Sequence, residues 1–192
     1  MAIRSFLAFE LPPDIKSMIK RVSEDVRRSN LNLKWVKVDN IHLTVVFMGD
    51  IRTEDVQVIG EKIEDVCLGC KPFEISLKGM GVFPDTRRPR VLWLGLEMET
   101  ERISSFRNSL QERLLAFGIK EEKRAFTPHL TLGRFDKPGR GDSFLGDIIS
   151  QYKDLKGPVC QLEELVMFKS ELKPGGAEYT KLKTCPLKGM IS

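Results

Sequence analysis

Both histidines of the chain occur in the same tripeptide, His-Leu-Thr. His42 lies in the segment IHLTV and His129 lies in the segment PHLTL. With ordinary leucine and threonine usage, the probability of this coincidence is on the order of 10⁻⁴ to 10⁻⁵. A single histidine in a strand is commonly a packing residue, but the repetition favours a shared chemical role for the pair.

The first copy reads as a β-strand, in which residues i and i+2 share a face. His42 and Thr44 are therefore expected on one face, with Val46 behind them. The opposite face is expected to carry the apolar residues Ile41, Leu43, Val45 and Phe47. The second copy repeats the pattern, with His129 and Thr131 opposite Leu130 and Leu132. Each strand thus has one side for a core and one side that presents an imidazole beside a hydroxyl.

Two imidazoles that converge on one pocket form an acid–base pair suited to phosphodiester chemistry. A neutral histidine accepts a proton from an attacking water, and a protonated one donates a proton to the departing oxygen. Histidine suits both roles because its unperturbed pKa of about 6.5 leaves both states accessible near neutrality. The threonine hydroxyls can donate to non-bridging phosphate oxygens. We therefore expect a site that needs neither a metal nor another cofactor.

The surrounding sequence predicts an α+β fold that positions these strands. Apolar stripes at helical spacing predict helices over 14–26, 53–66, 100–117 and 144–152. Segments typical of strands are 3–11, 33–38, 41–49, 73–83, 90–98, 128–135, 160–172 and 177–187. A glycine-rich loop is expected at 136–143.

The order of these elements suggests an internal duplication within a single domain, residues 1–192. Each half of the chain reads as a strand carrying His-Leu-Thr, then a helix, then a pair of strands. We expect two pseudo-symmetric lobes, each a mostly antiparallel sheet with flanking helices. Their histidine-bearing strands would meet about a pseudo-two-fold axis, with the active site in the cleft between the lobes.

The composition is that of a globular protein with a modest positive field. Apolar residues make up 41% and charged residues 30% of the 192 residues, which excludes a disordered chain. A net charge of +4 helps to collect a phosphate-bearing ligand. No apolar run approaches the roughly 20 residues that cross a bilayer, and the first residues lack the pattern of a signal peptide. We predict a cytoplasmic protein without a membrane partner, and we expect a monomer.

The four cysteines fit the same compartment as free thiols. Cys67 and Cys70 form a C-x-x-C pair, a spacing that occurs in zinc and redox sites. Cys160 and Cys185 supply no second pair, and no histidine lies near the first. We predict ordinary thiols and keep a zinc or redox role as a distant alternative.

The motifs and their flanks resemble the 2H phosphoesterases, in particular the bacterial and archaeal RNA 2′,3′-cyclic phosphodiesterases, once named 2′-5′ RNA ligases. The similarity includes the opening strand RSFLAFELP and the first motif NIHLTVVFMGDI. It continues through the central hairpin GVFPDTRRPRVLWLGLE and the second motif FTPHLTLGRF. It covers nearly the whole chain, and these segments in this order are specific.

The resemblance implies that His42 donates a proton to the leaving ribose oxygen and that His129 activates the water. It implies that Thr44 and Thr131 hold the phosphate. The implied substrate is an RNA or oligonucleotide end with a 2′,3′-cyclic phosphate, opened to a 2′-phosphate. The family also joins tRNA halves through a 2′-5′ linkage, the reverse of an equivalent cleavage. The spacing of the two motifs is symmetric, so the residues themselves leave the acid and base assignment open.

Arg134 resembles a basic residue that assists with phosphate in this family. Strict alternation places it on the face of Leu130 and Leu132, so it can reach the phosphate only if the strand bulges or ends near Gly133. Otherwise it is a solvated arginine.

Other side chains are candidates for contacts with RNA. Arg124 and the RRPR run at 87–90 can guide a nucleic acid backbone, although such residues are commonly just solvated. Phe9, Phe47 and Phe126 can stack on a terminal base, although aromatic residues in strand-like segments more often belong to the core.

Two further functions remain open from the sequence. The same site could work mainly as a ligase or on a small cyclic nucleotide. Alternatively, the chain could be a binding module that holds nucleotides or RNA ends without turnover. The presence of both motifs favours an enzyme, because a binder does not need two proton-transfer groups.

Overall fold

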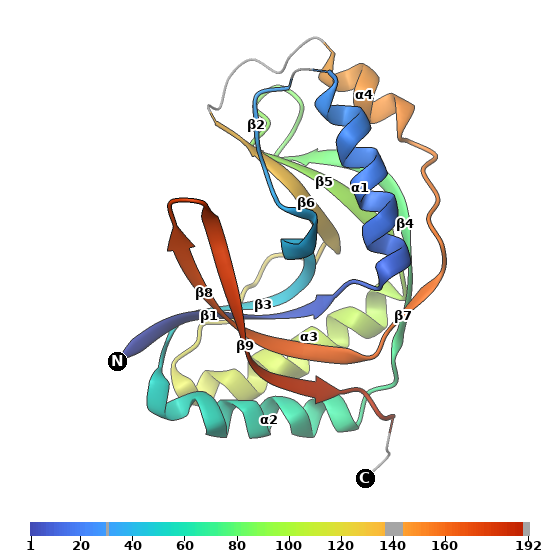
Figure 1. Cartoon of the computed structure of the whole chain (residues 1–192). Coiled ribbons are helices and arrows are strands. Elements are labelled where there is room, and N and C mark those ends of the chain that lie inside the picture. Colours follow the sequence, from blue (N-terminus) through green and yellow to red (C-terminus); the bar gives the residue numbers. More distant parts are fainter. Residues whose placement is uncertain (30, 137–143, 190–192) are drawn as a thin grey trace.

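Two antiparallel sheets form the frame of the protein, and the computed structural model describes residues 1–29, 31–136 and 144–189. The four-stranded sheet has the order β3 (His42–Arg52), β1 (Ala2–Glu10), β8 (Glu164–Lys173) and β9 (Gly176–Pro186). The five-stranded sheet has the order β2 (Leu33–Trp35), β6 (His129–Phe135), β5 (Val91–Glu97), β4 (Phe73–Phe83) and β7 (Cys160–Leu162). The five-stranded sheet lies above the four-stranded one in Figure 1. The predicted α+β class is confirmed.

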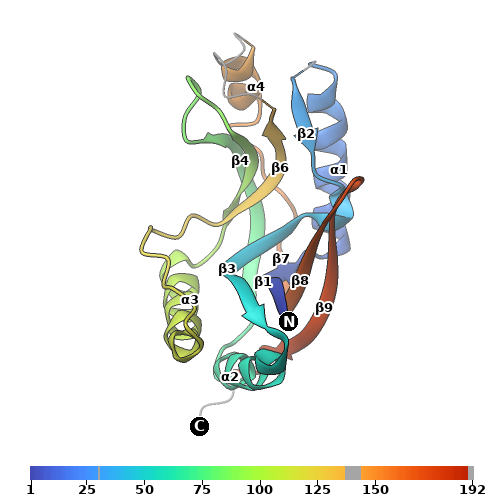
Figure 2. The ribbon, with the colours of Figure 1, turned by 90° about the vertical axis from the view of Figure 1, so that its left-hand side faces the viewer.

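Four α-helices flank the sheets within the described residues. They are α1 (Pro13–Arg27), α2 (Val56–Leu68), α3 (Thr100–Leu114) and α4 (Leu145–Gln151). Short 3-10 helices occupy Val38–Asn40 (η1), Thr53–Asp55 (η2) and Leu115–Phe117 (η3). The helices α2 and α3 lie against the four-stranded sheet, whereas α1 and α4 lie beside the five-stranded one (Figures 1 and 2). In this part of the chain, no helix is long and apolar enough to cross a membrane.

The two sheets do not correspond to the two halves of the chain, because each sheet takes strands from both halves. The four-stranded sheet pairs β1 and β3 from the beginning of the chain with β8 and β9 from its end. The segment 160–172, predicted as one strand, divides at Glu163. Its first part pairs with β4 in one sheet and its second part pairs with β1 in the other. Backbone pairing with two different partners therefore moves the chain between the sheets. The glycine-rich loop predicted at 136–143 lies, from residue 137 onward, outside the described residues.

Two irregularities in the pairing of β1 with β3 change which side chains face the core. The register shifts between Ser5 and Phe6 and again between Leu7 and Ala8. Since an extra residue in a strand breaks its alternation, side chains beyond the bulge exchange faces. Val46 is therefore buried, whereas Phe47 is 71% exposed. The predicted face is correct for His42, Leu43 and Thr44 but wrong for Val46 and Phe47.

The core is continuous between the sheets. One cluster of buried apolar residues includes members of β1, β3, β4, β5 and β6 together with the inner faces of the helices. Phe9 lies in this cluster with no exposed surface, against Phe73 and Phe106. The base contact predicted for Phe9 is therefore wrong, because alternation in β1 directs this ring away from the cleft.

The four cysteines are free thiols, as predicted. Cys67 lies in α2 and is buried, and so is Cys185 on β9. A hydrogen bond with Cys185 and burial raise the pKa of the Cys67 thiol. This pairing is between residues far apart in the sequence, and it differs from the C-x-x-C pair that the spacing singled out.

Truncation of one side chain on each side of the bulge in β3 tests whether the faces of the strand exchange there. Leu43→Ala is expected to reduce the free energy of unfolding by about 2–5 kcal/mol, because the side chain is fully buried. Phe47→Ala is expected to change it by no more than about 0.5 kcal/mol, since an exposed ring contributes little to packing. Denaturant unfolding of both variants measures the difference. Equal losses would contradict the exchange of faces after Val45.

Candidate active site

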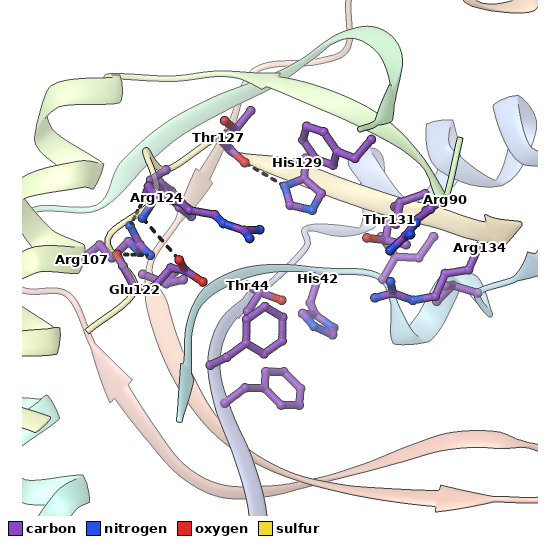
Figure 3. A pocket seen from close by; sticks show the side chains of 18 of the residues that line it. His42, Thr44, Arg90, Arg107, Glu122, Arg124, Thr127, His129, Thr131 and Arg134 are labelled. Carbon is purple, nitrogen blue, oxygen red and sulfur yellow. Dashed lines mark hydrogen bonds between the residues drawn. The ribbon is translucent and has the colours of Figure 1, made fainter. Parts of the chain in front are cut away.

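The strands β3 and β6 bring the two His-Leu-Thr segments to opposite sides of one cleft. The cleft has a volume of about 1340 Å³, and both histidines and both threonines line it. Figure 3 shows His129 across from His42 and Thr44. Leu43 and Leu130, the residues that follow the histidines, are fully buried behind them. The alternation predicted for the beginning of each strand is therefore confirmed.

Aromatic rings of the four-stranded sheet surround His42. Its ring stacks on Phe6 of β1, with centroids 4.8 Å apart and planes 23° apart. Tyr179 of β9 meets the imidazole edge-on at 5.3 Å, and Phe168 of β8 lies 6.2 Å away. These contacts restrict the orientation of the imidazole and cover part of its surface.

His129 has a similar aromatic environment on the five-stranded sheet. Phe83 of β4 meets its ring edge-on, with centroids 5.0 Å apart and planes 88° apart. Trp93 of β5 lies 6.4 Å away. Both imidazoles are thus half-buried between aromatic rings and the cleft.

A backbone carbonyl two residues before each histidine fixes its tautomer. His42 Nδ1 lies 2.8 Å from the carbonyl oxygen of Asn40, and His129 Nδ1 lies 2.8 Å from that of Thr127. A carbonyl oxygen only accepts hydrogen bonds, so each Nδ1 carries the proton that it donates. In both rings Nε2 remains available for a ligand in the cleft. The side chain of Asn40 in turn donates to the carbonyl of Ala177 on β9 at 2.9 Å.

Burial lowers the pKa of both histidines, but the charges around them differ. At His42, the hydrogen bond to the Asn40 carbonyl and the carboxylate of Glu10 partly oppose the lowering of the pKa. At His129, the Thr127 carbonyl opposes it, while the cation of Arg134 lowers the pKa further. Burial thus disfavours the charged imidazolium at both histidines, but Glu10 opposes this effect at His42, whereas Arg134 adds to it at His129.

A bulge in β6 brings Arg134 into the cleft. In the β5–β6 pairing, Leu92 pairs with Gly133 and Trp93 pairs with Thr131, so β6 has one extra residue between the two pairs. Arg134 lines the cleft together with Arg90, and Figure 3 shows both side chains beside Thr131. The condition stated from the sequence, a bulge near Gly133, is met.

Most of the sequence-derived candidates lie together in this cleft. The candidates that line it are His42, Thr44, Phe47, Arg88, Arg90, Arg124, Phe126, His129, Thr131 and Arg134. Arg87 of the RRPR run does not line it. Asp85 accepts the backbone N–H groups of both Arg87 and Arg88.

The residues of the lining that the sequence reasoning missed include Phe6, Phe83, Arg107 and Tyr179. One of them had a usable signal. Phe6 alternates with Leu7 and Phe9 in the first strand, so it had to lie on the face opposite the core. The other three lie on elements whose partners the sequence did not reveal.

Comparison with known proteins finds a matching family model and similar relatives. The family model of the 2′-5′ RNA ligase superfamily matches residues 11–173. An RNA 2′,3′-cyclic phosphodiesterase from Methanothermobacter thermautotrophicus is 33% identical over 183 residues, covering 95% of this chain and 98% of the relative. One from Methanocaldococcus jannaschii is 32% identical over 181 residues, covering 94% and 99%.

Solved structures share the fold over nearly the whole chain. The crystal structure of TT0787 from Thermus thermophilus gives a TM-score of 0.77 at 26% identity, covering 97% of this chain and 99% of that one. Escherichia coli LigT complexed with 3′-AMP gives a TM-score of 0.74 at 22% identity, with coverage of 97% and 99%, which shows the fold. By the extent of these matches, the chain belongs to the 2′-5′ RNA ligase superfamily.

Proposed function

We propose that the protein hydrolyses the 2′,3′-cyclic phosphate at an RNA end to a 2′-phosphate. The observation that carries the proposal is the pair of imidazoles that face one cleft, each with Nδ1 bound to a backbone carbonyl and Nε2 free. The activity of the curated relatives supports the substrate class, since they are RNA 2′,3′-cyclic phosphodiesterases. The 3′-AMP bound to E. coli LigT supports a nucleotide as the ligand of this fold.

In the proposed reaction, neutral His129 accepts a proton from water as the water oxygen attacks phosphorus. The bond from phosphorus to the ribose 3′-oxygen breaks, and protonated His42 donates its proton to that oxygen. Thr44 and Thr131 donate to the non-bridging oxygens, and Arg134 stabilises their charge, so no metal is required. If the 5′-hydroxyl of a second RNA replaced water, the same steps would form a 2′-5′ linkage, as in the joining of tRNA halves.

The charges around the histidines support this assignment of acid and base. Glu10 pairs directly with His42 across β1 and β3 and favours its protonated form. Arg134 favours the neutral form of His129. A donor must be protonated before the reaction and an acceptor must be neutral, so this difference fits His42 as donor and His129 as acceptor.

His42→Ala and His129→Ala are each expected to reduce turnover of a cyclic-phosphate-ended oligonucleotide by about 10²–10⁴-fold, because each removes one proton transfer. The wild-type product should be a 2′-phosphate, identified by chromatography against 2′- and 3′-phosphate standards. Circular dichroism of both variants serves as the control for folding. Full activity of either variant, or loss of wild-type activity with a chelator, would refute the mechanism. Tight binding of the oligonucleotide without hydrolysis would indicate the binding-module alternative.

The pH dependence of kcat/KM is expected to be bell-shaped and displaced to low pH. The rate falls as pH rises and deprotonates His42, and it falls as pH drops and protonates His129. Because burial lowers the pKa of both groups, the pH of maximal kcat/KM should be lower than it would be for two histidines with the ordinary pKa of about 6.5. A maximum well above neutral pH would contradict this environment.

The variant Glu10→Gln tests whether His42 is the proton donor or the proton acceptor. The carboxylate favours protonated His42, so its removal lowers the pKa of His42 and should reduce kcat/KM by about threefold above the pH optimum at low ionic strength. Below the optimum kcat/KM should not change. If His42 were instead the base, kcat/KM would rise below the optimum and stay constant above it.

Glu64→Gln is the matched control for this experiment. Glu10 pairs with Lys181 and Glu64 pairs with Lys183, both lysines being on β9, but only Glu10 acts on His42. The Glu64 variant should keep the wild-type pH profile.

A further inference from the structure

The segment that joins η3 to β6 forms one wall of the cleft. Its residues Lys120, Glu121, Glu122, Arg124, Ala125 and Phe126 line the cavity. This wall lies apart from the pair Arg90 and Arg134, with the histidines between them (Figure 3). The basic residues of the cleft therefore occupy two separate regions. Of these residues, the proposed reaction at the cyclic phosphate involves only Arg134, which lies beside Thr131.

Two buried side chains of α3 hold this wall in place. Arg107, which is 6% exposed, donates to the carbonyl oxygens of Arg124 and Glu122 at 3.2 Å each. Gln111 accepts the backbone N–H of Glu122 through Oε1 at 2.8 Å. A buried cation is costly unless it is hydrogen-bonded, so Arg107 favours this one path of the backbone. The wall is thus ordered before any ligand binds.

The ordered wall presents a cation and an aromatic ring to the cleft. The guanidinium of Arg124 points toward the space between the two strands (Figure 3). None of the ion pairs among the described residues involves Arg124, so an incoming anion need not displace a carboxylate. Phe126 lines the same wall, with its ring centroid 5.3 Å from the Arg107 guanidinium. A cation beside an aromatic ring is the combination that binds a single-stranded nucleic acid.

We infer that this wall is a subsite for the nucleotide that precedes the cyclic end of the RNA. Arg124 binds the phosphodiester that joins the last two nucleotides, and Phe126 stacks on the base of the penultimate one. Arg107 is a positioning residue that holds both. The inference rests on the proposed function, since it takes the cyclic phosphate to lie between the histidines.

A series of three substrates separates these contacts. The first is a nucleoside 2′,3′-cyclic phosphate, the second adds a 5′-phosphate, and the third is a dinucleotide with a cyclic end. For the wild type, kcat/KM should rise at each step. Arg124→Ala should remove most of the gain from the 5′-phosphate, about tenfold, and Phe126→Leu should remove most of the gain from the second base. Both losses should appear in KM rather than in kcat, because the contacts are equal in the ground and transition states.

Lys123→Ala is the matched control. It removes the same charge from the same segment, but its exposed side chain does not line the cleft. It should keep both gains. Equal losses from Lys123→Ala and Arg124→Ala would overturn the subsite and leave only a general positive field. An equal loss on all three substrates from Arg124→Ala would also overturn it and would place this residue at the cyclic phosphate.

Binding measurements keep the subsite testable without turnover. Calorimetric titration with the corresponding 2′-phosphate products should show the same stepwise gains in affinity and the same losses in the variants. Absence of turnover with these gains present would contradict the proposed function but support the subsite. Turnover without any gain from the second or third substrate would contradict the subsite alone.

Discussion

Each histidine depends on a strand that buries one face in the core and presents the other to the cleft. Leu43 and Leu130, directly after the histidines, have no exposed surface. A shift of either strand by one residue would move the imidazole into the core and the leucine into the cleft, so burial of the leucines fixes the register. The hydrogen bonds to the carbonyls of Asn40 and Thr127 then fix the ring, because they hold Nδ1 at the point where each strand begins.

The site is nearly symmetric in geometry but not in charge. Both imidazoles lie against aromatic rings, both donate through Nδ1 to the carbonyl two residues earlier, and burial lowers both pKa values. The asymmetry comes from two charged side chains of opposite sign. Glu10 on β1 lies beside His42, whereas Arg134 reaches His129 through the bulge in β6. Two equivalent imidazoles can therefore take opposite roles, since a nearby charge favours one protonation state over the other.

The crossing of the chain between the sheets couples the two sides of the cleft. β8 and β9 close the four-stranded sheet after the chain has built the five-stranded one. The helix α3 lies against the four-stranded sheet, yet its buried Arg107 holds the segment that leads into β6. One wall of the cleft is thus attached to both lobes.

The sequence by itself determined the elements that follow from local patterns. Alternation and helical stripes predicted nearly all strands and helices, and the repeated His-Leu-Thr predicted the facing pair of imidazoles with their threonines. Only the tertiary structure decided what depends on strand pairing. The bulges exposed Phe47, buried Val46 and brought Arg134 into the cleft, and pairing with two sheets divided the segment 160–172. It also decided which charge lies beside each histidine, because Glu10 faces His42 from the paired strand β1 and Arg134 enters the cleft only through the bulge in β6.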